Sequence, residues 1–144
     1  MLPYVILWGN HPLYDNGMSP TSPGAVGAFV AFATAAIRRY RGRGIIWELW
    51  NEPNTVFWGS QHGNYTQYAA LAHAVAAARN AAGLHTNTTT LVGPAAAGFG
   101  QNTTWTWPEG CGAAGCFDAF DAISVHAYRS SLEGPDDRKT TRLN

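Results

Sequence analysis

The sequence predicts an α/β fold with a parallel sheet, and two observations carry this prediction. Four apolar, β-favouring runs, near residues 3–8, 45–51, 89–93 and 122–127, alternate with segments of helical periodicity. Strands that alternate with helices favour parallel pairing through right-handed crossovers. The 144 residues, 46% hydrophobic and 12% charged, suffice for one domain with a core of its own. On the alternation alone, an open doubly wound sheet and part of a barrel are equally acceptable.

The connecting segments predict two longer helices and one short one. Ser22 followed by Pro23 is a favourable helix start, and apolar residues then recur at helical spacing. A second helix is expected over residues 64–82, because Gly83 is well placed to end it. A third, short helix is expected near residues 116–120.

The second expected strand ends in an unusual group of side chains. Residues 44 to 54 spell Gly-Ile-Ile-Trp-Glu-Leu-Trp-Asn-Glu-Pro-Asn. Pro53 cannot donate to a strand ladder, so the strand must stop before it. Asn51 and Glu52 are therefore expected at the C-terminal end of a buried strand, which is the end where parallel α/β proteins carry their chemistry.

The string Trp-Asn-Glu-Pro-Asn resembles the fourth-strand motif of the clan A glycoside hydrolases, which include the family-5 cellulases and the family-39 β-xylosidases. Three further strings resemble the third, fifth and sixth barrel strands of that clan: residues 3–8, 90–95 and 120–128, the last ending in His-x-Tyr. The resemblance covers roughly residues 3 to 129. It implies a partial (β/α)8 TIM barrel, covering about strands 3 to 6, within a domain of residues 1–136.

The resemblance also implies roles for particular residues. Glu52 is the expected general acid/base, and Asn51 is expected to hold a sugar 2-hydroxyl group. The other expected substrate-binding residues are His126 and Tyr128 after the sixth strand, Asn10 and His11 after the third, and Trp58 as a stacking platform. The chain then resembles a retaining β-glycosidase fragment, inactive alone, because the seventh-strand glutamate nucleophile has no counterpart in it. The alternative is a non-catalytic, carbohydrate-binding relative with the same barrel.

Glu48 is a second acidic residue on the same expected strand. Four residues of strand would separate it from Glu52 by about 13 Å. Retaining hydrolysis needs two carboxyl groups only about 5–5.5 Å apart. We therefore expect a structural role for Glu48, paired inside the barrel with an arginine or a hydrogen-bond donor. Asp15 is the best remaining acidic candidate for a sugar contact.

The two cysteines point to an oxidising compartment. Cys111 and Cys116 are five positions apart, a spacing that favours a small disulfide-closed loop over a zinc site. Three Asn-x-Thr sequons, at Asn64, Asn87 and Asn102, agree with secretion, although Asn64 is also placed to cap a helix. We therefore expect an extracellular protein.

Several function classes are disfavoured. The formal net charge is zero, and the one arginine cluster lies near an expected helix end, which argues against nucleic-acid binding. No apolar stretch is long enough to span a membrane. The histidines lack metal-ligand spacing and no Gly-rich phosphate-binding string occurs, so no metal or cofactor is expected.

The two ends of the chain do not look like natural termini. Residue 1 falls at the edge of a strand, with no leader before it, which favours a segment of a longer protein. Residues 137–144 change abruptly in composition and are expected to be a non-native tail.

Overall fold

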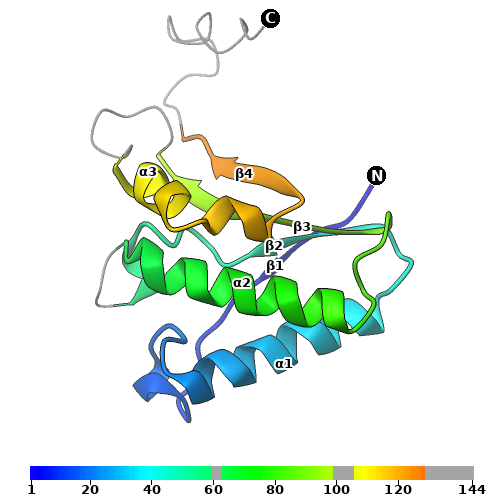
Figure 1. Ribbon diagram of the computed structural model, residues 1–144, viewed down its shortest axis with the longest axis horizontal. Coiled ribbons are helices and arrows are strands. Elements are labelled where there is room, and N and C mark those ends of the chain that lie inside the picture. The colour runs from blue at the N-terminus through cyan, green and yellow to red at the C-terminus, as the bar shows by residue number, and fades with distance from the viewer. Residues whose placement is uncertain (60–62, 99–105, 129–144) are drawn as a thin grey trace, which may run out of the picture.

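The computed structural model describes residues 1–59, 63–98 and 106–128, and the expected tail lies outside these ranges. The described strands are β1 (Tyr4–Leu7), β2 (Ile45–Leu49), β3 (Thr89–Ala97) and β4 (Ala122–His126). The helices are α1 (Pro23–Arg39), α2 (Tyr65–Ala81) and α3 (Thr106–Ala113), with 3-10 turns η1 (Asp15–Gly17), η2 (Val56–Trp58) and η3 (Cys116–Ala119). All strand pairs are parallel, in the order β1-β2-β3-β4 (Figure 1), so the α/β prediction is confirmed.

The two long helices begin where the sequence places them. The Ser22 hydroxyl accepts the Ala25 N–H at 3.3 Å at the start of α1. The Asn64 side chain accepts the Gln67 N–H at 2.9 Å at the start of α2, so this sequon asparagine is a helix cap.

The two faces of the sheet differ in character. Helices α1 and α2 lie side by side along one face (Figure 1), and the main core fills the space between them and the sheet. Buried members of this core include Leu7, Trp47, Leu49, Leu91, Phe29, Ile37, Leu71 and Val75. Side chains alternate along a strand, so the other face carries a different set. That set includes Tyr4, Glu48, Ser124 and His126, which are the polar groups of the site.

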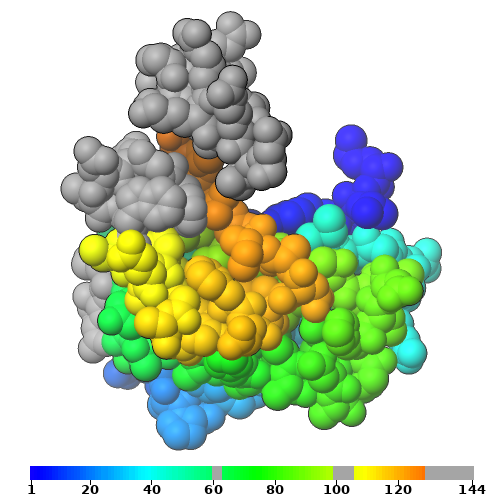
Figure 2. All heavy atoms as spheres, turned by 45° about the horizontal axis from the view of Figure 1, so that its top comes forward, coloured from blue at the N-terminus to red at the C-terminus, as the bar shows by residue number. Residues whose placement is uncertain are grey.

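The structure departs from the expected elements in two places. Strand β3 continues to Ala97, because an irregularity between Pro94 and Ala96 shifts the register with β4 and lets the ladder go on. Helix α3 lies in the segment expected as a cysteine-bearing loop, whereas the short helix expected near residues 116–120 is present as the 3-10 turn η3. The Cys111–Cys116 disulfide joins α3 to η3. In the space-filling view, the segment from α3 through η3 to β4, coloured yellow to orange, lies on the surface (Figure 2).

A buried ion pair fastens α2 to the N-terminal ends of the strands. The Arg79 guanidinium contacts the Asp121 carboxylate at 2.5 and 3.1 Å, and its side chain is 3% exposed. Asp121 also accepts the Leu91 N–H of β3 at 2.8 Å. Burial alone would raise the pKa of Asp121, but the hydrogen bonds from Arg79 and Leu91 lower it below its usual value. This contact lies at the N-terminal end of the strands, opposite to the end that carries Glu52.

Within the described ranges, no helix has the length and hydropathy needed to cross a bilayer.

Candidate active site

The chain leaves β2 through a tight, left-handed turn. Trp50 and Glu52 have φ of 66° and 47°, a region that costs non-glycine residues about 1–3 kcal/mol each. The turn is held by its surroundings: the buried Trp50 indole donates to the Phe57 carbonyl at 2.9 Å. The buried Tyr68 hydroxyl donates to the Leu49 carbonyl at 2.9 Å. Packing and hydrogen bonds thus fix the backbone that carries Glu52.

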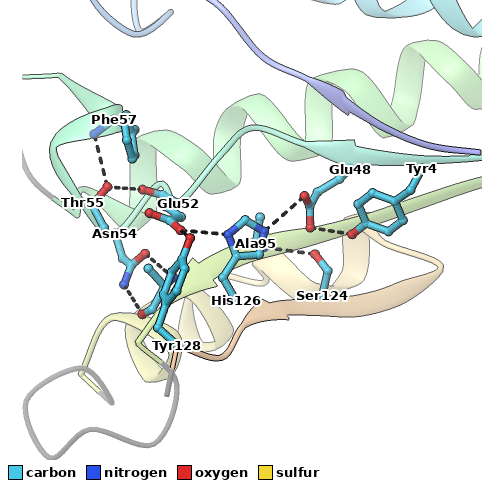
Figure 3. A network of polar contacts seen from close by, with 11 residues as sticks. Tyr4, Glu48, Glu52, Asn54, Thr55, Phe57, Ala95, Ser124, His126 and Tyr128 are labelled. Atoms are coloured by element: carbon cyan, nitrogen blue, oxygen red, sulfur yellow. Dashed lines mark hydrogen bonds and ion pairs between the residues drawn. The ribbon is translucent and has the colours of Figure 1, made fainter. Parts of the chain in front are cut away.

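Asn54 clamps this turn to the end of β3. Its side-chain amide donates to the Ala97 carbonyl at 2.9 Å, and its side-chain oxygen accepts the Ala97 N–H at 2.9 Å (Figure 3). One side chain therefore continues the β2–β3 pairing beyond the last backbone partner. The extension of β3 past its bulge is what brings Ala97 within reach.

The Glu52 carboxylate is buried and held by two side chains from the end of β4. Glu52 is 6% exposed. Its Oε1 lies 2.9 Å from His126 Nδ1 and accepts a hydrogen bond from the Tyr128 hydroxyl (Figure 3). The expected grouping of Glu52 with His126 and Tyr128 at one rim is therefore present. The sequence interpretation gave these two residues contacts to the sugar or the nucleophile, whereas here both contact Glu52 itself.

Glu48 reaches the other side of the same imidazole. Its Oε2 lies 3.3 Å from His126 Nε2, and its Oε1 accepts the Tyr4 hydroxyl at 2.6 Å. One imidazole ring contacts both glutamates, so the expected separation of about 13 Å between Glu48 and Glu52 was wrong. That value assumed an extended strand, whereas the strand ends at Leu49 and the chain turns back. Glu48 is 1% exposed with both oxygens occupied, so its expected structural pairing is with hydrogen-bond donors and not with an arginine.

The two glutamates shift the pKa values of the side chains that contact them. Burial by itself lowers the pKa of His126, but hydrogen bonds to Glu52 and Glu48 outweigh it and raise the pKa above its ordinary value. Burial and the bond to Glu48 raise the pKa of Tyr4 to about 12. The bond to Glu52 raises the pKa of Tyr128. Both hydroxyls thus remain donors at neutral pH.

The remaining sequence-predicted polar residues are not bonded to this centre in the described part of the chain. Asn51 is half-buried, and its side chain makes no hydrogen bond with any other described residue. Asn10 and His11 line a cavity of about 310 Å³ with Trp8 and Tyr14. Within the described part of the chain, neither contacts Glu52.

Trp58 is not a stacking platform. It is 2% exposed, packs edge-on against Trp50 and Tyr68, and so presents no face to a sugar. The correction has a simple cause: η2 turns Trp58 into the core, and sequence alone does not give that direction. Trp8 and Phe57, 47% and 40% exposed with ring centroids 5.9 Å apart, are the accessible aromatic pair that the sequence reasoning missed.

Asp15 does not reach toward the site as a free carboxylate. Its Oδ2 accepts the N–H groups of Thr21 and Ser22 at 2.7 and 2.9 Å. These bonds lower the pKa of Asp15 to about 2, the Ser22 contacts contributing most. Asp15 therefore fixes the backbone of Thr21 and Ser22, immediately before α1.

In the described ranges, no group of three or more histidine, cysteine, aspartate or glutamate side chains is arranged to hold a metal ion. The chemistry available to the site is that of two carboxylates, an imidazole and two phenols. This set can donate, accept and relay protons.

Two solved structures resemble the chain. One is a monomeric β-xylosidase from Caulobacter crescentus CB15, with TM-score 0.52, 23% identity and 72% of this chain covered. The other is a GH39 β-xylosidase from Caulobacter crescentus, with TM-score 0.53, 22% identity and 74% covered. The chain has part of their barrel fold. It spans only 21% and 24% of the two proteins' length. No protein-family model matches the chain, and neither does any curated protein sequence.

Asn54→Ala is expected to destabilise this barrel segment by about 1–3 kcal/mol, because it leaves the Ala97 N–H and carbonyl without their side-chain partners. Urea unfolding followed by tryptophan fluorescence measures the change. Asn87→Ala, at an exposed asparagine, is the matched control and should stay within about 0.5 kcal/mol of the unaltered chain. Equal stability of the two variants would show that the clamp contributes nothing.

Proposed function

We propose that the chain is the acid/base-bearing segment of a retaining β-glycoside hydrolase. The observation that carries the proposal is the placement of Glu52: a buried carboxylate after a parallel strand, bonded to an imidazole and a phenol from the next strand but one. Glu52 protonates the leaving glycosidic oxygen, and then removes a proton from the water that releases the sugar.

Asn51 hydrogen-bonds the sugar 2-hydroxyl group, and Trp8 and Phe57 offer apolar ring faces to the sugar. The amide of Asn51, which bonds no other residue in the described ranges, and the exposure of the aromatic pair support these roles. β-Xylosides are the first substrate class to test, because both structural neighbours are named β-xylosidases. The Cys111–Cys116 disulfide supports action outside the cell.

The second carboxylate is supplied by another part of a longer protein. Glu48 cannot serve, since it is 1% exposed and engaged by Tyr4 and His126. A non-catalytic carbohydrate-binding relative is the second candidate, and the lack of an accessible carboxylate beside Glu52 in the described residues favours it. Xylo-oligosaccharide binding without turnover by the longer protein would support that candidate.

The 144-residue chain alone is expected to leave nitrophenyl β-xylosides unhydrolysed, because one carboxyl group cannot complete the two-step displacement. Release of nitrophenol over the uncatalysed background measures this. Turnover by the purified chain that is abolished by Glu52→Gln would refute the need for a second carboxylate from elsewhere. Turnover that survives Glu52→Gln would point to a contaminating enzyme.

A further inference from the structure

We propose that Glu48 is a positioning residue that fixes the His126 ring between two carboxylates, so that Nδ1 presents its proton to Glu52. The final step, from a fixed ring to an oriented acid/base, rests on the function proposed above. The fixing of the ring itself does not.

The burial of Glu48 indicates that its carboxylate has a role in the site. A carboxylate removed from water is costly unless it is paired and hydrogen-bonded. Glu48 is 1% exposed, yet its two oxygens are each assigned: Oε1 to the Tyr4 hydroxyl at 2.6 Å and Oε2 to His126 Nε2 at 3.3 Å. An apolar side chain would fill this position on β2 at lower cost, so the carboxylate must serve a neighbour.

The neighbour is the imidazole, and the chemistry of its two nitrogens decides the arrangement. An ionised carboxylate only accepts hydrogen bonds, so each nitrogen that bonds one must carry a proton. His126 has a glutamate at each nitrogen, at 2.9 Å and 3.3 Å. With both carboxylates ionised, both bonds can exist together only in the doubly protonated ring. Removing either charge leaves one nitrogen without an anionic acceptor.

The other polar groups around the ring do not supply a substitute. Tyr4 from β1 bonds Glu48, and Tyr128 after β4 bonds Glu52 and stands edge-on to the imidazole with centroids 6.3 Å apart. Ser124 accepts the Ala95 N–H. Among the described residues, the only charged groups that contact His126 are the two glutamates.

The fixed ring matters because Glu52 depends on it. His126 Nδ1 and the Tyr128 hydroxyl are the two side-chain donors on Glu52. A ring free to rotate would leave Glu52 with one side-chain donor, so its carboxylate would be held less firmly. Glu48 therefore acts on Glu52 through His126, without touching it.

The test is a titration of the imidazole in the whole 144-residue chain, using ¹⁵N-histidine labelling and NMR, with His126→Gln to assign the signal. In the unaltered chain, both His126 nitrogens are expected to be protonated at pH 7. Glu48→Gln, which keeps the side-chain shape and removes the charge, is expected to lower the His126 pKa by about one pH unit or more. Glu109→Gln, the same change at an exposed glutamate, should leave the titration as it is.

Two results would overturn the proposal. One is a His126 titration that is the same in Glu48→Gln as in the unaltered chain, with a native circular dichroism spectrum. The other, which needs no folded variant, is a ring in the unaltered chain that carries a single proton at pH 7. Neither readout involves a sugar, so failure of the glycosidase proposal would leave this result standing, and the reverse also holds.

Discussion

Glu52→Gln in the longer protein is expected to slow hydrolysis of unactivated β-xylosides by about 10²–10⁴-fold, the usual contribution of a positioned general acid/base. Gln has nearly the same shape and can still accept from His126 and Tyr128, so the fold should survive. It cannot give a proton to a leaving oxygen. Substrates with good leaving groups need little help in the first step, and their glycosylation should be slowed far less.

The measurement is kcat/KM for xylobiose and for a dinitrophenyl β-xyloside in both proteins. Glu109→Gln is the control, since that glutamate is exposed on α3 and bonded to no described residue. An equal loss on the activated and the unactivated substrate would assign Glu52 a role other than proton donation.

Arg79→Met is expected to lower the free energy of unfolding by about 3 kcal/mol, because it leaves the Asp121 carboxylate partly buried and without its cation. The Leu91 N–H, the His85 imidazole 3.2 Å from Asp121 and the 24% exposure of Asp121 keep the loss at the lower end of the range for broken buried pairs. Arg38→Met removes an exposed arginine from the end of α1 and should change stability by less than about 0.5 kcal/mol.

The same ion pair has a pH signature. The folded pKa of Asp121 is lowered, so its contribution is complete above the unfolded value of about 3.9 and is lost as the pH falls through the folded pKa. Arg79→Met should therefore be less stable at pH 7 and lose less on acidification than the unaltered chain. Adding Asp121→Asn to Arg79→Met should recover part of the stability, since no unpaired charge remains. A double variant no better than the single one would contradict the ion-pair explanation.

Much of the fold follows from local signals in the sequence. Ser22 and Asn64 cap helices where their short polar side chains precede helical periodicity, and β4 ends at His126 as expected. Strand β2 ends at Leu49, earlier than the limit set by Pro53. These signals act within a few residues, so no tertiary knowledge is needed to use them. Helix α3 escaped notice because glycine and proline dilute its periodicity.

The contacts of the site were less accessible from the sequence. The alternation of side chains along strands could have placed Tyr4 and Glu48 on one face of the sheet. It could not have placed the His126 ring between two glutamates, because that arrangement depends on the left-handed turn at Trp50 and Glu52. The prediction that Trp58 stacks on a sugar was wrong for the same reason, because packing sets the direction of a side chain after a tight turn. The clamp by Asn54 depends on a bulge in a strand far along the chain.

The outermost strands have a practical consequence. β1 and β4 each have one hydrogen-bonded neighbour in the described sheet, and both carry exposed apolar side chains, among them Val5, Ile6, Ile123 and Val125. Exposed edge strands of this kind pair readily with further strands. A separately produced polypeptide with matching strands is therefore expected to dock on these edges. If the proposed function holds, recovered β-xyloside hydrolysis would report that docking, as in a split reporter.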